Sequence, residues 1–198
     1  VLMKKLIGII AILTIIFIYG CSKQPSSIKA KQDGKPLIVM YGDFKCPYCK
    51  KVEDKVMPKL RNKYIDKNKV KFQYVNLAFI GKDSIIGSRA QQAVNHYAPK
   101  YSLQFQTLMF EHQKDEDKKW ITHTLIDKQI DKLNISNKTK DKIKTNYKTK
   151  NSTSWKAAEK DKKLGKEHHI KQTPTVFIEG KKVKDPYDFS SYQKLLEE

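Results

Sequence analysis

Residues 36–51 have the sequence PLIVMYGDFKCPYCKK, in which an apolar run ends at a Cys-Pro-Tyr-Cys tetrad. The apolar run predicts a short buried strand. Pro47 favours the first turn of a helix, where its missing N–H costs nothing. Cys46 would then lie at a helix N-terminus, where unpaired backbone N–H groups and the helix dipole favour a thiolate. Cys49 lies about one helical turn later, so the two cysteines are predicted to cycle between dithiol and disulfide.

Half of a zinc site is the first alternative, because two cysteines at this spacing can also be metal ligands. A structural zinc site usually has four ligands, and the sequence contains no second cysteine pair. The histidines also lack zinc-finger spacing after the tetrad; they are His96, His112, His123, His168 and His169. We therefore expect redox chemistry rather than metal binding, with no cofactor besides the cysteine pair itself.

A length of 198 residues is what we expect of one domain with an insertion. Besides the tetrad the chain contains only Cys21, so no structural disulfide framework remains and stability is expected to come from packing. The formal charge of +19 would attract anionic lipids or wall polymers. Nucleic acid is not an expected partner, because arginine is the residue favoured for phosphate and base contacts and the chain has only Arg61 and Arg89. The lysines are scattered along the sequence, which a compositional bias explains better than a binding site.

The N-terminal residues have the layout of a secretory signal: Lys4 and Lys5, the apolar residues 6–18, and a small residue before Cys21. The apolar run is too short to be a comfortable transmembrane helix. Residues 18–21, Ile-Tyr-Gly-Cys, resemble the lipobox of bacterial lipoproteins. This resemblance implies cleavage before Cys21, attachment of a lipid to its sulfur, and a location on the outer face of the cell membrane. An uncleaved anchor and an ordinary signal peptide are the alternatives, and both also predict export.

The chain is therefore divided into a signal peptide at residues 1–20, a polar tether at residues 21–35 and one domain at residues 36–198. After the tetrad, apolar residues recur every four positions and predict a helix with one buried face; they are Val52, Val56, Leu60 and Tyr64. Pro58 should kink this helix. Residues 70–77 alternate as a strand does, which completes a parallel strand-helix-strand unit with the tetrad at the carboxyl end of its first strand.

Almost no strand pattern occurs between residues 84 and 165, where we expect helices at residues 88–98, 103–112, 120–133, 138–150 and 154–164. Ser136 or Asn137 is the expected N-cap of the fourth helix, and Gly165 suits a helix C-terminus. The aromatic residues are expected in the core of this bundle; they are Tyr97, Phe105, Phe110, Trp120 and Trp155. Residues 114–119 carry many charges and predict a solvated loop.

The strand pattern returns at residues 175–178, followed by a tight turn at 179–181 and a hairpin partner at 182–184. A last helix is expected at residues 189–196, where Phe189, Tyr192, Leu195 and Leu196 share a face.

Together, the tetrad at a strand-to-helix junction, the helical middle and Thr173-Pro174-Thr175 before a hairpin resemble the DsbA family of thiol:disulfide oxidoreductases, in particular its lipid-anchored members in Gram-positive bacteria. The resemblance implies an α/β, thioredoxin-like fold, formed by about residues 36–82 and 166–198, with a helical domain inserted at about residues 83–165. It also implies that Pro174 is a cis-proline next to the cysteine pair and that Thr173 binds substrate.

By the same resemblance, Cys46 is the attacking thiol, Cys49 is the resolving thiol, and Pro47 and Tyr48 tune the pair. The expected activity is donation of a disulfide to reduced exported proteins, with a reoxidant that the sequence does not identify. An isomerase or reductase with the same site, a glutaredoxin, and a lipid-anchored binding protein with structural cysteines are the alternatives. The leader and the long helical middle argue against a small cytosolic glutaredoxin.

Overall fold

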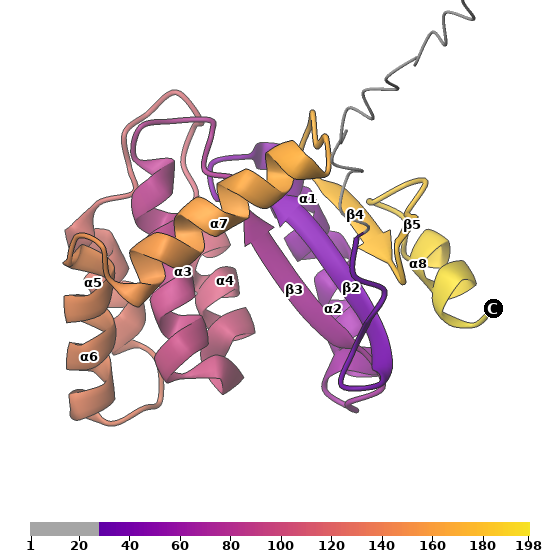
Figure 1. The fold of residues 1–198 in the computed structure, drawn as a ribbon, viewed down its shortest axis with the longest axis horizontal. Helices are drawn as coiled ribbons and strands as arrows, with labels where there is room; N and C mark the ends of the chain where they lie inside the picture. Colours follow the sequence, from indigo (N-terminus) through magenta and orange to yellow (C-terminus); the bar gives the residue numbers. More distant parts are fainter. Residues whose placement is uncertain (1–27) are drawn as a thin grey trace, which may run out of the picture.

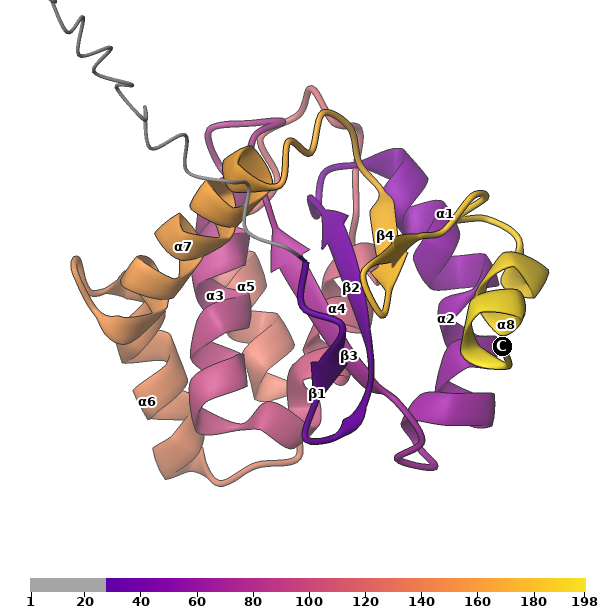
Figure 2. The same cartoon turned by 45° about the vertical axis from the view of Figure 1, so that its right-hand side comes forward.

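The structure is a computed structural model that describes residues 28–198. The predicted signal peptide, the lipobox with Cys21 and residues 21–27 of the predicted tether lie outside the described residues. In Figures 1 and 2, α5 and α6 lie at one end of the molecule and α8 at the opposite end, with the sheet between them. The architecture is the thioredoxin-like α/β fold that the sequence predicts, with a group of helices inserted between the third and fourth strands.

The sheet is organised around β2 (Lys35–Gly42), which contains the apolar run before the tetrad. It pairs in parallel with β3 (Lys71–Asn76) and antiparallel with β4 (Thr175–Ile178), and β4 continues to β5 (Lys181–Lys182). In the β2–β4 register, Tyr41 is opposite Thr175 and Met40 is opposite Val176. The strand predictions at residues 70–77 and 175–178 are confirmed.

Both faces of β2 are buried, which explains its continuous apolar sequence. Ile38 and Met40 face the main core, to which side chains from the helices also contribute. Leu37, Val39 and Tyr41 face a smaller cluster with Leu77, Leu164 and other residues. The period of two along the strand therefore divides one apolar run between two cores.

The helix after the tetrad is α1 (Pro47–Lys55), and it is followed by α2 (Met57–Leu60) and a π-helical turn at Arg61–Ile65. The interruption at Val56 confirms the kink expected from Pro58, because the proline ring cannot donate to the carbonyl of Asp54. The last helix, α8 (Phe189–Leu196), buries Tyr192 against the same core, as predicted.

The insertion between β3 and β4 consists of five α-helices and one 3-10 turn; these are α3 (Ser84–Tyr97), η2 (Pro99–Tyr101), α4 (Ser102–Glu111), α5 (His123–Asp131), α6 (Asn137–Lys148) and α7 (Thr153–Glu167). Ser136 is the N-cap of α6, and its hydroxyl accepts a hydrogen bond from the Thr139 N–H. In Figure 1, α7 runs from α5 and α6 back to the sheet, and it contacts both α3 and β3.

Three expectations about this insertion are wrong in detail. The first helix begins at Ser84, not at residue 88. Trp120 precedes a helix instead of starting one, because Thr122 is the N-cap of α5. Gly165 lies inside α7, where a Cβ would meet Leu77 Cδ2 at 2.4 Å, so the glycine permits close packing of α7 on β3.

Aromatic packing follows the prediction for four of the five residues. Phe105, Phe110 and Trp120 are buried in the main core, and Tyr97 is half-buried against it. Trp155 is the exception: it is half-buried and does not belong to the main core, and the Arg89 guanidinium lies 3.2 Å from the centroid of its ring.

Residues 31–35 are not part of a structureless tether. Lys31–Gln32 forms β1, which pairs antiparallel with the start of β2. Asp33 and Gly34 connect the two strands with φ angles of 51° and 73°. An Asp-Gly pair with two positive φ angles is a favoured hairpin turn, so the signal was present in the sequence.

Within residues 28–198, none of the helices is long and apolar enough to cross a membrane.

Candidate redox site

Cys46 is held at the junction of β2 and α1 by backbone geometry. It is the N-cap of α1, with φ −73° and ψ 114°, and Pro47 occupies the first turn as predicted. The Cys49 N–H donates a hydrogen bond to the Cys46 sulfur at 3.3 Å. An N-cap side chain normally accepts such a bond through oxygen, and here a sulfur atom takes that place.

Thr173 and Pro174 lie directly beside Cys46, although 127 residues separate Thr173 from Cys46 in sequence. The Thr173–Pro174 peptide bond is cis, as the resemblance implies. The Cys46 thiol donates to the Thr173 carbonyl at 3.4 Å. This juxtaposition follows from the sheet, because β4 begins at Thr175 opposite Tyr41 near the end of β2.

The two cysteines are free thiols with opposite pKa shifts. A hydrogen bond from the Cys49 thiol is the largest cause that lowers the pKa of Cys46, from 9.0 to about 7; burial opposes it, and Thr173 and the N–H groups of Cys49 and Tyr48 add to it. Burial is the largest cause that raises the pKa of Cys49 well above its ordinary value. The geometry therefore favours a thiolate at Cys46 and a protonated thiol at Cys49.

Two exposed aromatic side chains belong to segments of the site: Tyr48 lies between the two cysteines in sequence, and the Phe79 N–H donates to Asp43. Tyr48 is 61% exposed, and Phe79, which follows β3, is 55% exposed. Tyr187 is half-buried, with the Lys51 ammonium 4.6 Å from its ring centroid. Burial is the largest cause that raises the pKa of Tyr187, and the charge of Cys46 adds to it. A surface with exposed aromatic rings can receive apolar side chains of another polypeptide.

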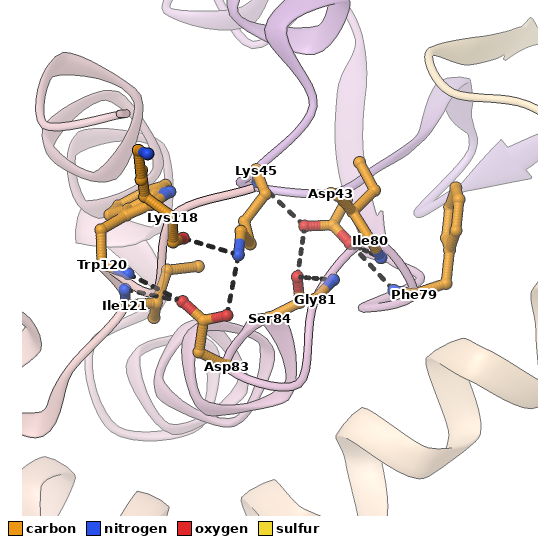
Figure 3. Close-up of polar contacts among 10 residues, drawn as sticks. All are labelled: Asp43, Lys45, Phe79, Ile80, Gly81, Asp83, Ser84, Lys118, Trp120 and Ile121. Carbon is orange, nitrogen blue, oxygen red and sulfur yellow. Dashed lines mark hydrogen bonds and ion pairs between the residues drawn. The ribbon is translucent and has the colours of Figure 1, made fainter. Parts of the chain in front are cut away.

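The sequence did not identify the buried charges that support the tetrad. Figure 3 shows Asp43 and Lys45, which precede Cys46, together with Asp83 at the start of α3. Their exposed fractions are 0%, 2% and 4%. The Lys45 ammonium is 2.8 Å from an Asp83 carboxylate oxygen, so Lys45 and Asp83 form a buried ion pair. Charged residues directly beside a predicted catalytic cysteine were a usable signal, but their burial was not visible in the sequence.

Two further buried carboxyl groups lie on helices that pack against the site's scaffold. Glu53 of α1 accepts hydrogen bonds from Gln106 and Thr107 of α4. Asp161 of α7 accepts from the Asn76 N–H and from Gln92. Burial is the largest cause that raises both pKa values, that of Asp161 to about 7. Among residues 28–198 no three His, Cys, Asp or Glu side chains are grouped as metal ligands would be.

Comparison with known proteins decides the family. The thioredoxin family model matches residues 28–198. Disulfide bond formation protein D of Bacillus subtilis (strain 168) is 32% identical over 181 residues, which cover 89% of this chain and 79% of that protein. The chain is a DsbA-type member of the thioredoxin family.

Solved structures agree with this assignment. The crystal structure of oxidised BdbD from Bacillus subtilis is 30% identical, has a TM-score of 0.74, and is matched over 88% of this chain and 94% of that chain. MdbA, a thiol-disulfide oxidoreductase from Actinomyces oris, has a TM-score of 0.66 at 21% identity, over 83% of this chain and 80% of that chain, and supports the fold alone. This DsbA-type protein is therefore a disulfide oxidoreductase.

Proposed function

We propose that this oxidoreductase donates disulfides to reduced exported proteins through Cys46 and Cys49. The observation that carries the proposal is the asymmetry of the two thiols: the pKa of Cys46 is lowered to about 7, whereas the pKa of Cys49 is raised. A thiol with a low pKa is a good leaving group, and a stabilised thiolate favours the reduced form of the pair. Such a pair passes its disulfide to other thiols.

In the proposed reaction, a substrate thiolate attacks Cys46 in the oxidised protein. A bond forms between the substrate sulfur and Cys46, the Cys46–Cys49 bond breaks, and Cys49 leaves with the electron pair and takes up a proton. The second substrate thiolate then attacks the substrate sulfur of the mixed disulfide, and Cys46 leaves as a thiolate. The substrate loses two electrons and two protons in total; the protein gains both electrons and one proton, on Cys49, and the other proton is released to solvent.

Thr173 and Pro174 would hold the substrate during this exchange. The Thr173 carbonyl lies 3.4 Å from the Cys46 sulfur, so an extended peptide that pairs with the Thr173 backbone would bring its cysteine to the reactive atom. Pro47 and Tyr48 complete the tetrad; Tyr48 is largely exposed and available to contact substrate. We propose no metal and no cofactor other than the disulfide.

Redox equilibrium with glutathione is the direct test of the donor direction. We expect a reduction potential well above the value of about −270 mV that is typical of thioredoxin. A potential as low as that of thioredoxin would favour the alternative function, a reductase. Cys46→Ser should abolish oxidation of a reduced peptide while leaving the fold intact, and activity retained by this variant would refute the site assignment.

Export and lipid anchoring are a separate part of the proposal and depend on the leader. The basic, apolar and Ile-Tyr-Gly-Cys segments support cleavage before Cys21 and lipid attachment to its sulfur. The test is fractionation of cells that express the full chain, compared with cells that express Cys21→Ala. The wild-type protein should be in the membrane fraction and should incorporate a labelled fatty acid, and the variant should not. Equal labelling of both proteins would refute lipidation at Cys21.

A further inference from the structure

Two buried acids connect the segment before Cys46 to the insertion: Asp43 within the segment and Asp83 at the start of α3. Asp43 accepts hydrogen bonds from four donors: the N–H groups of Lys45, Phe79 and Ile80 and the Ser84 hydroxyl, at 2.9 to 3.0 Å. The Cys46 N–H in turn donates to the Asp43 carbonyl at 3.0 Å. Asp43, the residue that follows β2, is therefore fixed to the loop after β3 and to the first turn of α3 (Figure 3).

Lys45 extends this connection to a second part of the insertion. Its ammonium contacts Asp83 and the Lys118 carbonyl, each at 2.8 Å. The other Asp83 oxygen accepts the N–H groups of Trp120 and Ile121 at 3.0 and 2.9 Å. Burial alone would raise the pKa of Asp83, but the hydrogen bonds from Lys45 and these N–H groups lower it, so Asp83 is ionised at neutral pH.

Gln113, from the loop after α4, holds the other side of the same peptide segment. Its side-chain amide donates to the carbonyl of Phe44 at 2.6 Å and to the carbonyl of Cys46 at 3.0 Å. The Cys46 carbonyl also accepts the N–H groups of Cys49 and Lys50, which form the first turn of α1. Asp83 therefore holds Lys45 directly before the reactive cysteine, and Gln113 binds the peptide of the cysteine itself. Both Asp83 and Gln113 belong to the insertion.

We propose that Lys45 and Gln113 are positioning residues through which the helical insertion sets the redox equilibrium of the Cys46–Cys49 pair. This inference rests on the proposed function of that pair. The action is through geometry: the Lys45 charge is neutralised by Asp83, whereas the Cys46 thiolate depends on the Cys49 N–H at 3.3 Å and on the N-terminus of α1. A small rotation of the Cys46 backbone would weaken these contacts and destabilise the reduced form.

The first experiment compares Lys45→Met and Gln113→Ala with wild type in glutathione redox buffers, in the full folded chain. We expect each variant to be less oxidising, with an equilibrium constant changed roughly tenfold for Lys45→Met, as the loss of a charged hydrogen bond would cause. Lys50→Met is the matched control, because Lys50 pairs at the surface with Asp54 and should change the constant less than twofold, as surface pairs contribute little.

A second measurement separates positioning from a loss of stability. If the insertion stabilises the reduced form through these contacts, the difference in unfolding free energy between reduced and oxidised protein must shrink in each variant by RT times the natural logarithm of the factor by which the redox constant changes. A destabilisation that is equal in both redox states, with an unchanged redox constant, would overturn the proposal.

Gln113→Ala keeps the proposal testable should Lys45→Met not fold, because the Gln113 side chain is only half-buried and its removal leaves no buried charge. A redox constant for Gln113→Ala equal to that of wild type would then refute the inference. Failure of the proposed function would be seen in a different experiment. If Cys46→Ser still oxidised a reduced peptide, the assignment of Cys46 would be rejected, independently of the results for the Lys45 and Gln113 variants.

Discussion

The ionisation of Cys46 should depend most strongly on its own partner, Cys49. The Cys49 thiol is the largest cause that lowers the pKa of Cys46, to about 7. With that pKa about half of the Cys46 thiols are ionised at pH 7, whereas with the ordinary value only about one in a hundred would be. Replacing Cys49 by alanine removes this hydrogen bond but keeps the backbone N–H, so the pKa of Cys46 should rise toward its ordinary value.

The assay is thiolate absorbance near 240 nm between pH 4 and 10, with alkylation rates at each pH as a second readout. For the wild type we expect a single titration near pH 7 in the reduced protein and none in the oxidised protein. Cys49→Ala should titrate at higher pH and react more slowly at pH 7, by at most about 50-fold if all stabilisation were lost. Cys46→Ser is the control, because Cys49 should remain protonated across this range.

Two results would contradict this reasoning. A wild-type titration at pH 8.5 or above would mean that the helix N-terminus does not stabilise the thiolate. An unchanged titration in Cys49→Ala would mean that the backbone alone controls the pKa. The shift also has a stability consequence: a lowered pKa in the folded state stabilises the reduced protein at high pH, and this stabilisation is lost as the pH falls through about 7.

Three further predictions concern the scaffold. Asp161→Asn should stabilise the protein at pH 8, because the pKa of Asp161 is raised from 3.8 to about 7 and its ionisation costs on the order of 4 kcal/mol there; urea unfolding at pH 4 and pH 8 should show the advantage only at the higher pH. Gly42→Ala should lower the unfolding free energy by about 1–3 kcal/mol, because the new methyl group would meet the Tyr74 ring at 2.6 Å; an unchanged denaturation midpoint would mean that Tyr74 can move away. Asp83→Ala should cost about 3–5 kcal/mol by leaving the Lys45 ammonium buried without its partner; calorimetry that shows less than 1 kcal/mol would indicate that water reaches Lys45.

Local chemistry made the architecture of the candidate site predictable from the sequence. An apolar run followed by Cys-Pro-Tyr-Cys predicts a strand, a helix start and a cysteine at the helix N-terminus within residues 36–51, and each of these is a short-range property. The N-cap of α6 was predictable for the same reason as one of two residues, Ser136 or Asn137, and the Ser136 side chain accepts the capping hydrogen bond. The kink at Pro58 needed only the missing N–H of proline.

The remaining features depend on partners that are distant in sequence. Lys45 is buried only because Asp83 meets it, 38 residues later. Trp120 lies outside a helix because its N–H donates to that same carboxylate. Gly165 is compatible with a helix end and with close packing inside a helix, and only the neighbouring Leu77 decides between them. Sequence periodicity alone contains none of these contacts.

The register between β2 and β4 links reactivity to correct folding. Met40 is opposite Val176, and both side chains belong to the main core. A slip of one residue would turn every β4 side chain to the opposite face and move Thr173 about 3.3 Å along the sheet, away from the Cys46 sulfur. Misaligned chains would therefore lose the contact between Thr173 and Cys46 at the moment they lose the core, so the proposed thiol exchange would be confined to molecules that have reached the native strand alignment.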